Sequence, residues 1–250
     1  PASHPSLAAV VGAQFWHSDG SFRPVPSHAS IVHCPVPVPL GRGGETAFVS
    51  QRHAWNTLPP DMQRLAWTLT AVHDLAYSRA LANPDMRGSE DIPSQFPPVC
   101  HPVVRETATG PTLFLGAHAS HLLGWDLDEG RELICQLNNH ICNVGDEFVL
   151  QHSWREGDVV IYDNRAVLHR GQPFDNADHT PRKLARVTVA GRPPPPPRVD
   201  VATSPKLAPL PAPELATQLR AAVGVSDLGE IGETRRYYGH FAGARTRPAL

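Results

Sequence analysis

Three side chains of the sequence, His17, Asp19 and His169, have the chemistry to bind a metal ion together. His17 and Asp19 stand two positions apart in "FWHSDGSF", and residues i and i+2 of an extended strand project from one face. His169, in "GDVVIYDNRAVLHR", is the candidate for a second imidazole that folding brings to this pair. Two imidazoles and one carboxylate bind ferrous ion while leaving positions open for oxygen and a chelating cosubstrate.

A pair of arginines follows the second histidine in "TPRKLARVTVAG". Arg182 and Arg186 stand four positions apart, so on a strand both guanidinium groups project from one face. A planar, permanently charged guanidinium can bind a carboxylate through two parallel hydrogen bonds. The hydroxyl of Thr46, in the turn "GRGGETAF", could contact the same carboxylate. These residues predict a site for a small carboxylate beside the metal ligands.

Each of these residues also has a simpler interpretation when it is taken alone. Fourteen histidines make a chance His-x-Asp pair plausible, and arginines on a sheet edge can simply be solvated. A zinc hydrolase could use the same three ligands with a bound water, but it has no need of the paired arginines. A β-sandwich binding protein with a decayed site is the non-enzymatic alternative.

The elements that must position these residues are mostly short strands. Segments rich in β-branched and aromatic residues, bounded by Gly, Pro, Asp and Asn, predict strands at 27–38, 46–50, 111–116, 147–154, 157–164 and 183–191. Helical periodicity is confined to 59–75 and 126–142. This pattern favours an antiparallel sandwich or jelly roll with helical insertions. Structural roles are expected for His33, His53, His73 and His101.

Proline divides the chain. The sequence contains 27 prolines, about twice the usual share, and "GRPPPPPRVDVATSPKLAPLPAPE" predicts a polyproline-type spacer. We therefore expect a main domain over residues 1–192, a Pro-rich spacer over 193–213, and a C-terminal tail over 214–250 that packs on the domain or is partly mobile.

Composition argues against several classes of partner. A net charge of −2 without a lysine or arginine block argues against nucleic acid and anionic membrane surfaces. No apolar run approaches the roughly 18 residues of a membrane-spanning helix. The four cysteines show no CxxC spacing, which indicates reduced thiols and a cytoplasmic location; they are Cys34, Cys100, Cys135 and Cys142.

Taken in order, "WHSDGSF", "GGETAFVS", "WREGDVVIYDNRAVLHR" and "PRKLARVTVAG" resemble the taurine/2,4-dichlorophenoxyacetate dioxygenase (TauD/TfdA) family, and the phenoxyalkanoate-degrading branch in particular. The resemblance extends over residues 15–191. It implies a double-stranded β-helix, which is a cupin-like jelly roll. It also implies an Fe(II)- and 2-oxoglutarate-dependent dioxygenase that consumes O2. The family has a longer segment before this motif, so we expect that an N-terminal part is missing here.

The resemblance assigns roles to the matching residues. His17, Asp19 and His169 match the iron ligands of the family. Arg182 matches the arginine that binds the distal carboxylate of 2-oxoglutarate, and Thr46 matches the threonine that assists it.

A different set of side chains is expected to contact the prime substrate. Arg186 matches the arginine that faces the acid group of the substrate. Arg182 follows His169 by 13 positions, which is more than the family leads us to expect. A small insertion is therefore predicted in residues 171–180, and the two arginines could exchange roles. Further candidate substrate contacts are Arg79, His118 and Ser120.

The reaction implied by the resemblance is hydroxylation of a small, anionic organic substrate with release of succinate and CO2. The substrate would be a carboxylate, sulfonate or sulfate ester, and hydroxylation beside the heteroatom would cleave a C–O or C–S bond. Asp19 argues for hydroxylation because related halogenases carry a small residue there. A biosynthetic oxygenase that desaturates or cyclises a carboxylic or amino acid is the alternative. We expect a homo-oligomer, either a dimer or a tetramer.

Overall fold

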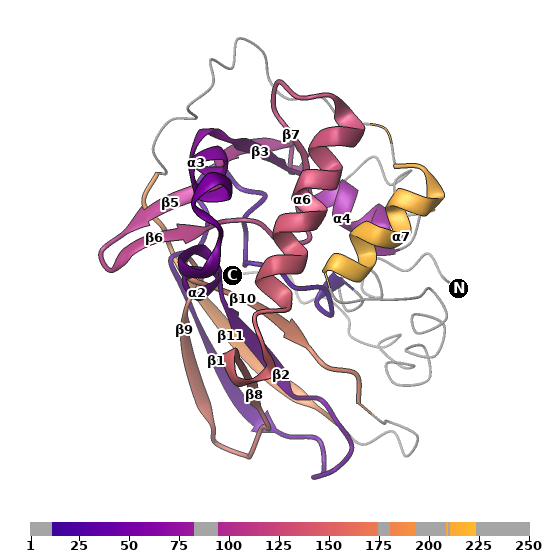
Figure 1. Cartoon of the computed structure of the whole chain (residues 1–250). Coiled ribbons are helices and arrows are strands. Elements are labelled where there is room, and N and C mark those ends of the chain that lie inside the picture. The colour runs from indigo at the N-terminus through magenta and orange to yellow at the C-terminus, as the bar shows by residue number, and fades with distance from the viewer. Residues whose placement is uncertain (1–11, 83–94, 175–180, 194–208, 210, 224–250) are drawn as a thin grey trace.

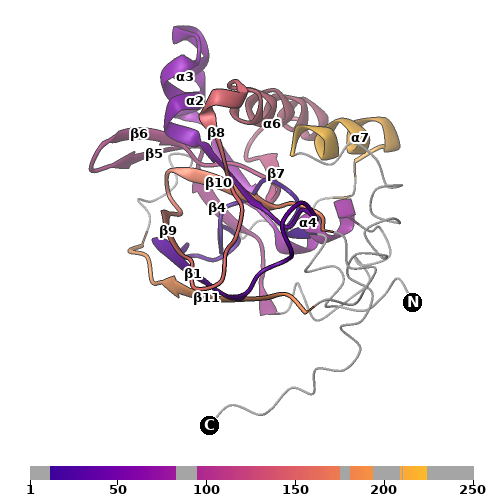
Figure 2. The same cartoon turned by 90° about the horizontal axis from the view of Figure 1, so that it is seen from below.

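Two three-stranded antiparallel sheets face each other in the computed structural model, which describes residues 12–82, 95–174, 181–193, 209 and 211–223 (Figure 1). The first sheet has the order β11-β1-β9, and the second has the order β10-β2-β8. Seen from below in Figure 2, the two sheets enclose a common interior. This is the core of a double-stranded β-helix. The strands are β1 (Ala29–Val36), β2 (Thr46–Ser50), β8 (Val149–His152), β9 (Val159–Asp163), β10 (Val167–Gly171) and β11 (Lys183–Val189).

Side-chain alternation decides which residues line that interior. Because neighbours on a strand point to opposite faces, β1 sends Val32 and Cys34 inward while Ile31 and His33 face outward. Phe48 from β2 and Tyr162 from β9 pack against Val32 and Cys34 in one buried cluster. Both sheets therefore contribute side chains to the space in which a site can form.

Helices cover the other face of the β10-β2-β8 sheet. Helix α6 (Leu127–Cys142) carries an apolar face, and in Figure 1 it runs past β7 (Ala119–Leu122) so that its lower end reaches this sheet. Its N-terminus is capped by the Asp126 carboxylate, which accepts from the amides of residues 128 and 129. Ala47 and Val49 of β2, Leu168 of β10 and buried residues of α6 belong to one cluster. Helices α2 (Gln51–Thr57) and α3 (Pro60–Thr68) follow β2.

A third sheet lies beside this core with the strand order β4-β3-β7. Its strands are β3 (Thr70–His73), β4 (Val99–Pro102) and β7 (Ala119–Leu122). The helix predicted over 59–75 is therefore wrong beyond Thr68, because residues 70–73 are all buried and paired on both sides. Tertiary pairing overrides the local helical pattern here. The remaining elements are α4 (Leu75–Ala82), β5 (Val104–Thr107), β6 (Gly110–Leu113), η2 (Asp146–Phe148) and α7 (Pro213–Ala222).

The segment after the Pro-rich stretch contributes helix α7, which lies beside α6. The Cys135 thiol of α6 contacts the carbonyl of Gln218, and the Trp16 amide donates to the carbonyl of Val223 at 2.8 Å. Most of the predicted spacer and residues 224–250 of the predicted tail lie outside the described residues.

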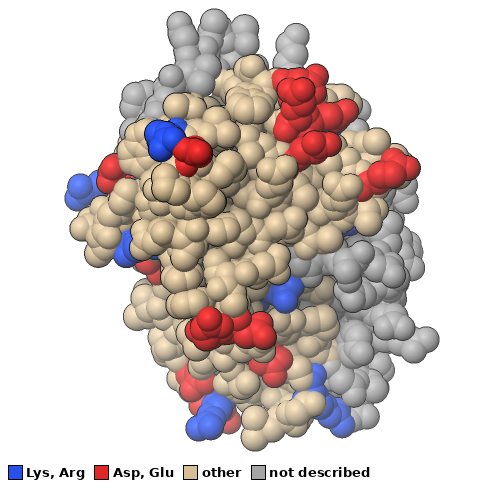
Figure 3. Space-filling view, in the orientation of Figure 1, with Lys and Arg blue, Asp and Glu red and all other residues tan. Residues whose placement is uncertain are grey.

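Charge is distributed without a large basic patch on the face shown in Figure 3, where the arginines and lysines of the described residues are scattered. Among the described helices, none is long and apolar enough to cross a membrane.

Candidate metal centre

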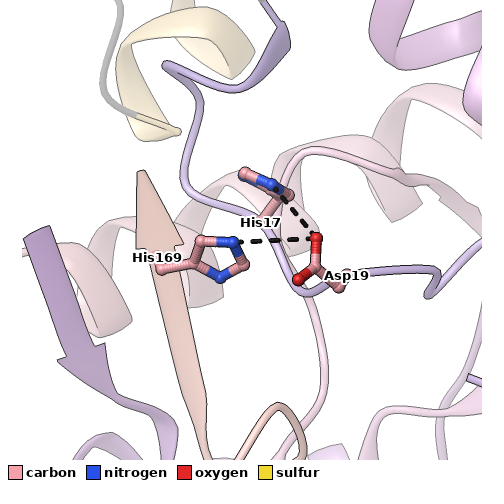
Figure 4. A group of neighbouring side chains, drawn as sticks. All are labelled: His17, Asp19 and His169. Carbon is pink, nitrogen blue, oxygen red and sulfur yellow. Dashed lines mark ion pairs between the residues drawn. The ribbon is translucent and has the colours of Figure 1, made fainter. Parts of the chain in front are cut away.

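His17, Asp19 and His169 lie together in the interior of the sandwich (Figure 4). One donor atom of each side chain falls within 4.8 Å of the others. Asp19 Oδ1 is 3.9 Å from His17 Nε2 and 3.7 Å from His169 Nε2. All three residues are buried. Among the described residues, no other cluster of three His, Cys, Asp or Glu side chains could hold a metal ion.

The backbone that presents the two histidines is a single antiparallel bridge. The His17 amide donates to the His169 carbonyl at 3.1 Å, and the His169 amide donates to the His17 carbonyl at 2.9 Å. Asp19 lies in the turn that follows, so the strand expected through both His17 and Asp19 is shortened to one bridging residue. The Asn164 side chain holds this turn by accepting from the Asp19 amide at 2.7 Å and donating to the Asp19 carbonyl at 2.8 Å.

Both imidazoles are held neutral. Burial lowers the pKa of His17, and Asp19 only partly offsets this effect. Burial together with the neighbouring His17 lowers the pKa of His169 to about 3. The His17 Nδ1–H donates to the Phe15 carbonyl at 2.7 Å, which leaves the Nε2 lone pair facing Asp19. A neutral imidazole nitrogen is the form that binds a metal ion.

The two oxygens of the Asp19 carboxylate have different partners. Oδ2 accepts hydrogen bonds from the Ser30 hydroxyl at 2.7 Å and from the Tyr162 phenol at 2.9 Å. Oδ1 faces the two imidazoles and contacts the Arg186 guanidinium. Burial opposes ionisation of Asp19, but His169, His17, Arg186 and Ser30 outweigh it and lower its pKa. The carboxylate is therefore ionised and presents one oxygen to the centre.

This donor set fits a divalent transition-metal ion. Two neutral imidazole nitrogens and one carboxylate oxygen converge from one side, which is the arrangement of the 2-His-1-carboxylate centres. Hydroxyl groups that fix the non-ligating oxygen are the outer contacts such centres require.

Thr46 and Arg182 lie at the same end of β2. Phe48 pairs with His169 and Thr46 pairs with Gly171, so Thr46 is two residues further along the inward face. The Thr46 hydroxyl accepts from Trp154 Nε1 at 3.0 Å. Arg182 donates from Nη2 to the Gly44 carbonyl, two residues before Thr46, at 2.9 Å. The structure thus brings these two predicted residues near each other, while residues 175–180 of the predicted insertion lie outside the described residues.

The other candidate substrate contacts separate into two groups. The His118 ring lies 6.1 Å from the His17 ring, and its Nδ1 is 2.9 Å from the Ser78 hydroxyl. Arg79 is close enough to lower the pKa of both His17 and His118 electrostatically. The Ser120 hydroxyl instead donates to the Val72 carbonyl at 3.0 Å. His118 and Arg79 border the centre, whereas Ser120 serves the third sheet.

Sequence reasoning missed the contacts that Ser30, Tyr162 and Asn164 make with Asp19. All three are buried polar residues within or next to apolar strands. Strand alternation places Ser30 on the inward face with Val32 and Cys34, which is a signal that could have identified it. Asn164 could not have been found in this way, because its partner Asp19 is 145 residues away in the sequence.

Comparison with known proteins agrees with this geometry. The profile described as "Taurine catabolism dioxygenase TauD, TfdA family" matches residues 2–188. The alpha-ketoglutarate-dependent 2,4-dichlorophenoxyacetate dioxygenase of Burkholderia sp. (strain RASC) is 39% identical over 181 residues, covering 72% of this chain and 59% of the relative. The enzyme of the same name from Cupriavidus pinatubonensis is 41% identical over 178 residues, covering 70% and 60%.

A solved structure gives the same result for the fold. The crystal structure of AAD-2 in complex with Mn(II) and N-oxalylglycine has a TM-score of 0.68 and 33% identity, and the match covers 75% of this chain and 72% of AAD-2. The chain spans about three fifths of the length of the two dioxygenases that it matches. Since the family profile covers most of the sequence, the chain belongs to the taurine catabolism dioxygenase TauD, TfdA family.

Proposed function

We propose that this chain carries the active site of an Fe(II)- and 2-oxoglutarate-dependent dioxygenase that hydroxylates a small anionic substrate. The observation that carries the proposal is the buried group of His17, Asp19 and His169, with Asp19 Oδ1 facing both imidazoles. The family relationship supports the same assignment.

In this proposal His17 Nε2, Asp19 Oδ1 and His169 Nε2 hold the ferrous ion. When bound, that ion supplies the activation of O2 and of 2-oxoglutarate. The chain supplies position, charge and a dry environment. Phe48 and Tyr162 exclude water from one side of the centre, since their rings lie 6.1 Å and 4.7 Å from the His169 ring.

Arg182 and Thr46 are proposed to bind the distal carboxylate of 2-oxoglutarate. A bidentate guanidinium contact, assisted by a hydroxyl, fixes a carboxylate in both position and orientation. Arg182 is already oriented by the Gly44 carbonyl and lies 5.1 Å from the Phe174 ring. This environment restricts the guanidinium before the cosubstrate arrives.

Arg186 is proposed to bind the acid group of the prime substrate. It touches Asp19 from the edge of the interior, and its side chain is 49% exposed, so an anion from solvent can reach it. The relatives named for 2,4-dichlorophenoxyacetate make phenoxyalkanoates the first substrates to test, followed by sulfate esters and sulfonates. Desaturation or cyclisation of a carboxylic acid is the alternative outcome at the same centre.

Two further predictions concern the whole protein. A homo-oligomer is expected from the sequence. A cytoplasmic location is proposed on the basis of the four cysteines, all of which are free thiols.

The proposal is tested by adding Fe(II) and 2-oxoglutarate under anaerobic conditions and recording the visible spectrum. A metal-to-ligand charge-transfer band is expected for this chain and should be absent for Asp19→Ala. Succinate release is then measured with phenoxyalkanoates, sulfate esters, sulfonates and amino acids. A colourless protein that retains stoichiometric zinc would instead support the hydrolase alternative.

A further inference from the structure

A pocket of about 250 Å³ lies outside the metal centre, between the β5–β6 hairpin and one end of the β11-β1-β9 sheet. Figures 1 and 2 show β5, β6 and β9 on the same side of the molecule. The residues that line the pocket include none of the three metal ligands and none of Thr46, Arg182 and Arg186. Its charged lining residues are Arg105, Glu106, Arg165 and Arg192.

Arg105 is the unusual member of this set because it is a buried cation that forms no ion pair with any carboxylate of the described residues. The residue is 9% exposed, and its guanidinium carbon lies 3.4 Å from the centre of the Phe114 ring. Nε and Nη2 of Arg105 are fully buried without a hydrogen-bond partner among the described residues, so Nη1 is the guanidinium nitrogen left to contact a ligand in the pocket. Burial lowers its pKa to about 9. A buried charge is costly unless it is paired, so this position favours an anion brought from outside.

The neighbours of Arg105 do not supply that anion. Burial lowers the pKa of both His73 and His101, and the charge of Arg105 lowers it further, so both imidazoles are neutral. Glu106 also lines the pocket, but as the next residue on β5 its side chain projects to the other face of the strand from that of Arg105, so the two are not paired. No ion pair joins Glu106 to any of the three arginines within the described part of the chain.

The other two arginines add positive charge at the rim. Arg165 is oriented by a bidentate pair with Asp163, with N···O distances of 2.9 and 2.8 Å. Arg192 is exposed on the segment that follows β11. Three arginines therefore line the space, and the carboxylates of Asp163 and Glu106 offset their charge only in part.

We propose that this pocket is a second anion site, which binds the carboxylate or phosphate group of a small organic molecule with Arg105 as its central contact. The volume is below the roughly 300–1,000 Å³ typical of pockets for drug-sized ligands, which limits the ligand to a small one. Guanidinium groups bind the oxygens of carboxylate and phosphate alike.

The test is isothermal titration of the full, metal-free chain with inorganic phosphate and, separately, with acetate, at an ionic strength held constant with chloride. The two probes distinguish a tetrahedral oxyanion from a planar one. Arg105→Gln should weaken binding of the preferred probe at least tenfold. Arg64→Gln, which changes an exposed arginine of α3 far from this pocket in the sequence, should change this binding less than twofold.

Two further variants keep the test decisive if Arg105→Gln does not fold. Arg105→Lys retains the charge but loses the planar fork, so weaker binding is expected with the fold preserved. Arg192→Gln changes only the exposed rim and should weaken binding several-fold. Binding that is unchanged in Arg105→Lys and Arg192→Gln, or the absence of binding by both probes to the unmodified chain, would overturn the proposal.

Discussion

The phenol of Tyr162 donates a 2.9 Å hydrogen bond to Asp19 Oδ2, and the Tyr162 hydroxyl oxygen lies 3.1 Å from His169 Nε2. Tyr162 thus connects two of the three proposed metal ligands. Together with the Ser30 hydroxyl it fixes the carboxylate oxygen that faces away from the imidazoles. The orientation of Asp19 is therefore set by the β1 and β9 strands and not by the turn alone.

Tyr162→Phe is expected to weaken metal binding about tenfold, since removal of an outer contact to a metal ligand typically costs 10- to 100-fold in affinity. Anaerobic titration with Fe(II), or aerobic titration with Mn(II), measures the change. Tyr77→Phe is the matched control, because the Tyr77 hydroxyl is buried without a hydrogen-bond partner among the described residues. Equal affinities of the two variants would show that Tyr162 does not orient Asp19.

Asp19→Ala should abolish metal binding at micromolar concentrations while leaving the chain folded. The substitution removes the only anionic ligand and also leaves Ser30 and Arg186 without their carboxylate partner. Circular dichroism monitors the fold, and metal content after dialysis monitors the site. His33→Ala, on the outward face of β1, should retain the metal. Retention of stoichiometric metal by Asp19→Ala would place the centre elsewhere.

Arg182→Lys should weaken 2-oxoglutarate binding tenfold or more, because a bidentate fork becomes a single point charge. Arg186→Lys should leave that affinity within twofold and weaken binding of the prime substrate instead. The intensity of the anaerobic chromophore against 2-oxoglutarate concentration gives the affinity. If the two variants show the reverse pattern, the arginines have exchanged roles along β11.

Much of the sandwich could be predicted from sequence because its strands have strong local signals. β1, β2, β8, β9 and β11 all fall inside predicted segments, and α6 matches its predicted bounds within one residue. Several elements were not predicted: β5, β10, α2 and α7 fall outside the predicted strands and helices, and α4 shares only Leu75 with the predicted helix. β3 lies inside a helical pattern, while β4 and β7 are four residues long and take their form from pairing with β3.

The residues of the candidate site could be chosen from their types, but their arrangement could not. The bridge between His17 and His169 and the bonds from Asn164 to Asp19 join positions about 150 residues apart. Local periodicity contains no information about such contacts. The ion pair between Arg186 and Asp19 could not be predicted for the same reason, since it forms only when the whole sandwich closes.

Acid should destabilise the fold through His101, which packs against Phe114. Burial and Arg105 lower its pKa to about 3, whereas an unfolded histidine titrates near 6.5. The unfolded chain thus binds more protons between these values, and stability is lost as pH falls below about 6.5. His101 alone should account for about 2 kcal/mol of the free energy of unfolding lost between pH 7 and 5. Urea unfolding at both pH values should show a loss smaller by this amount in His101→Gln, whose amide can still donate to the Arg23 carbonyl that His101 Nε2 contacts at 3.0 Å. An equal loss in both proteins would show that His101 does not resist protonation in the folded state.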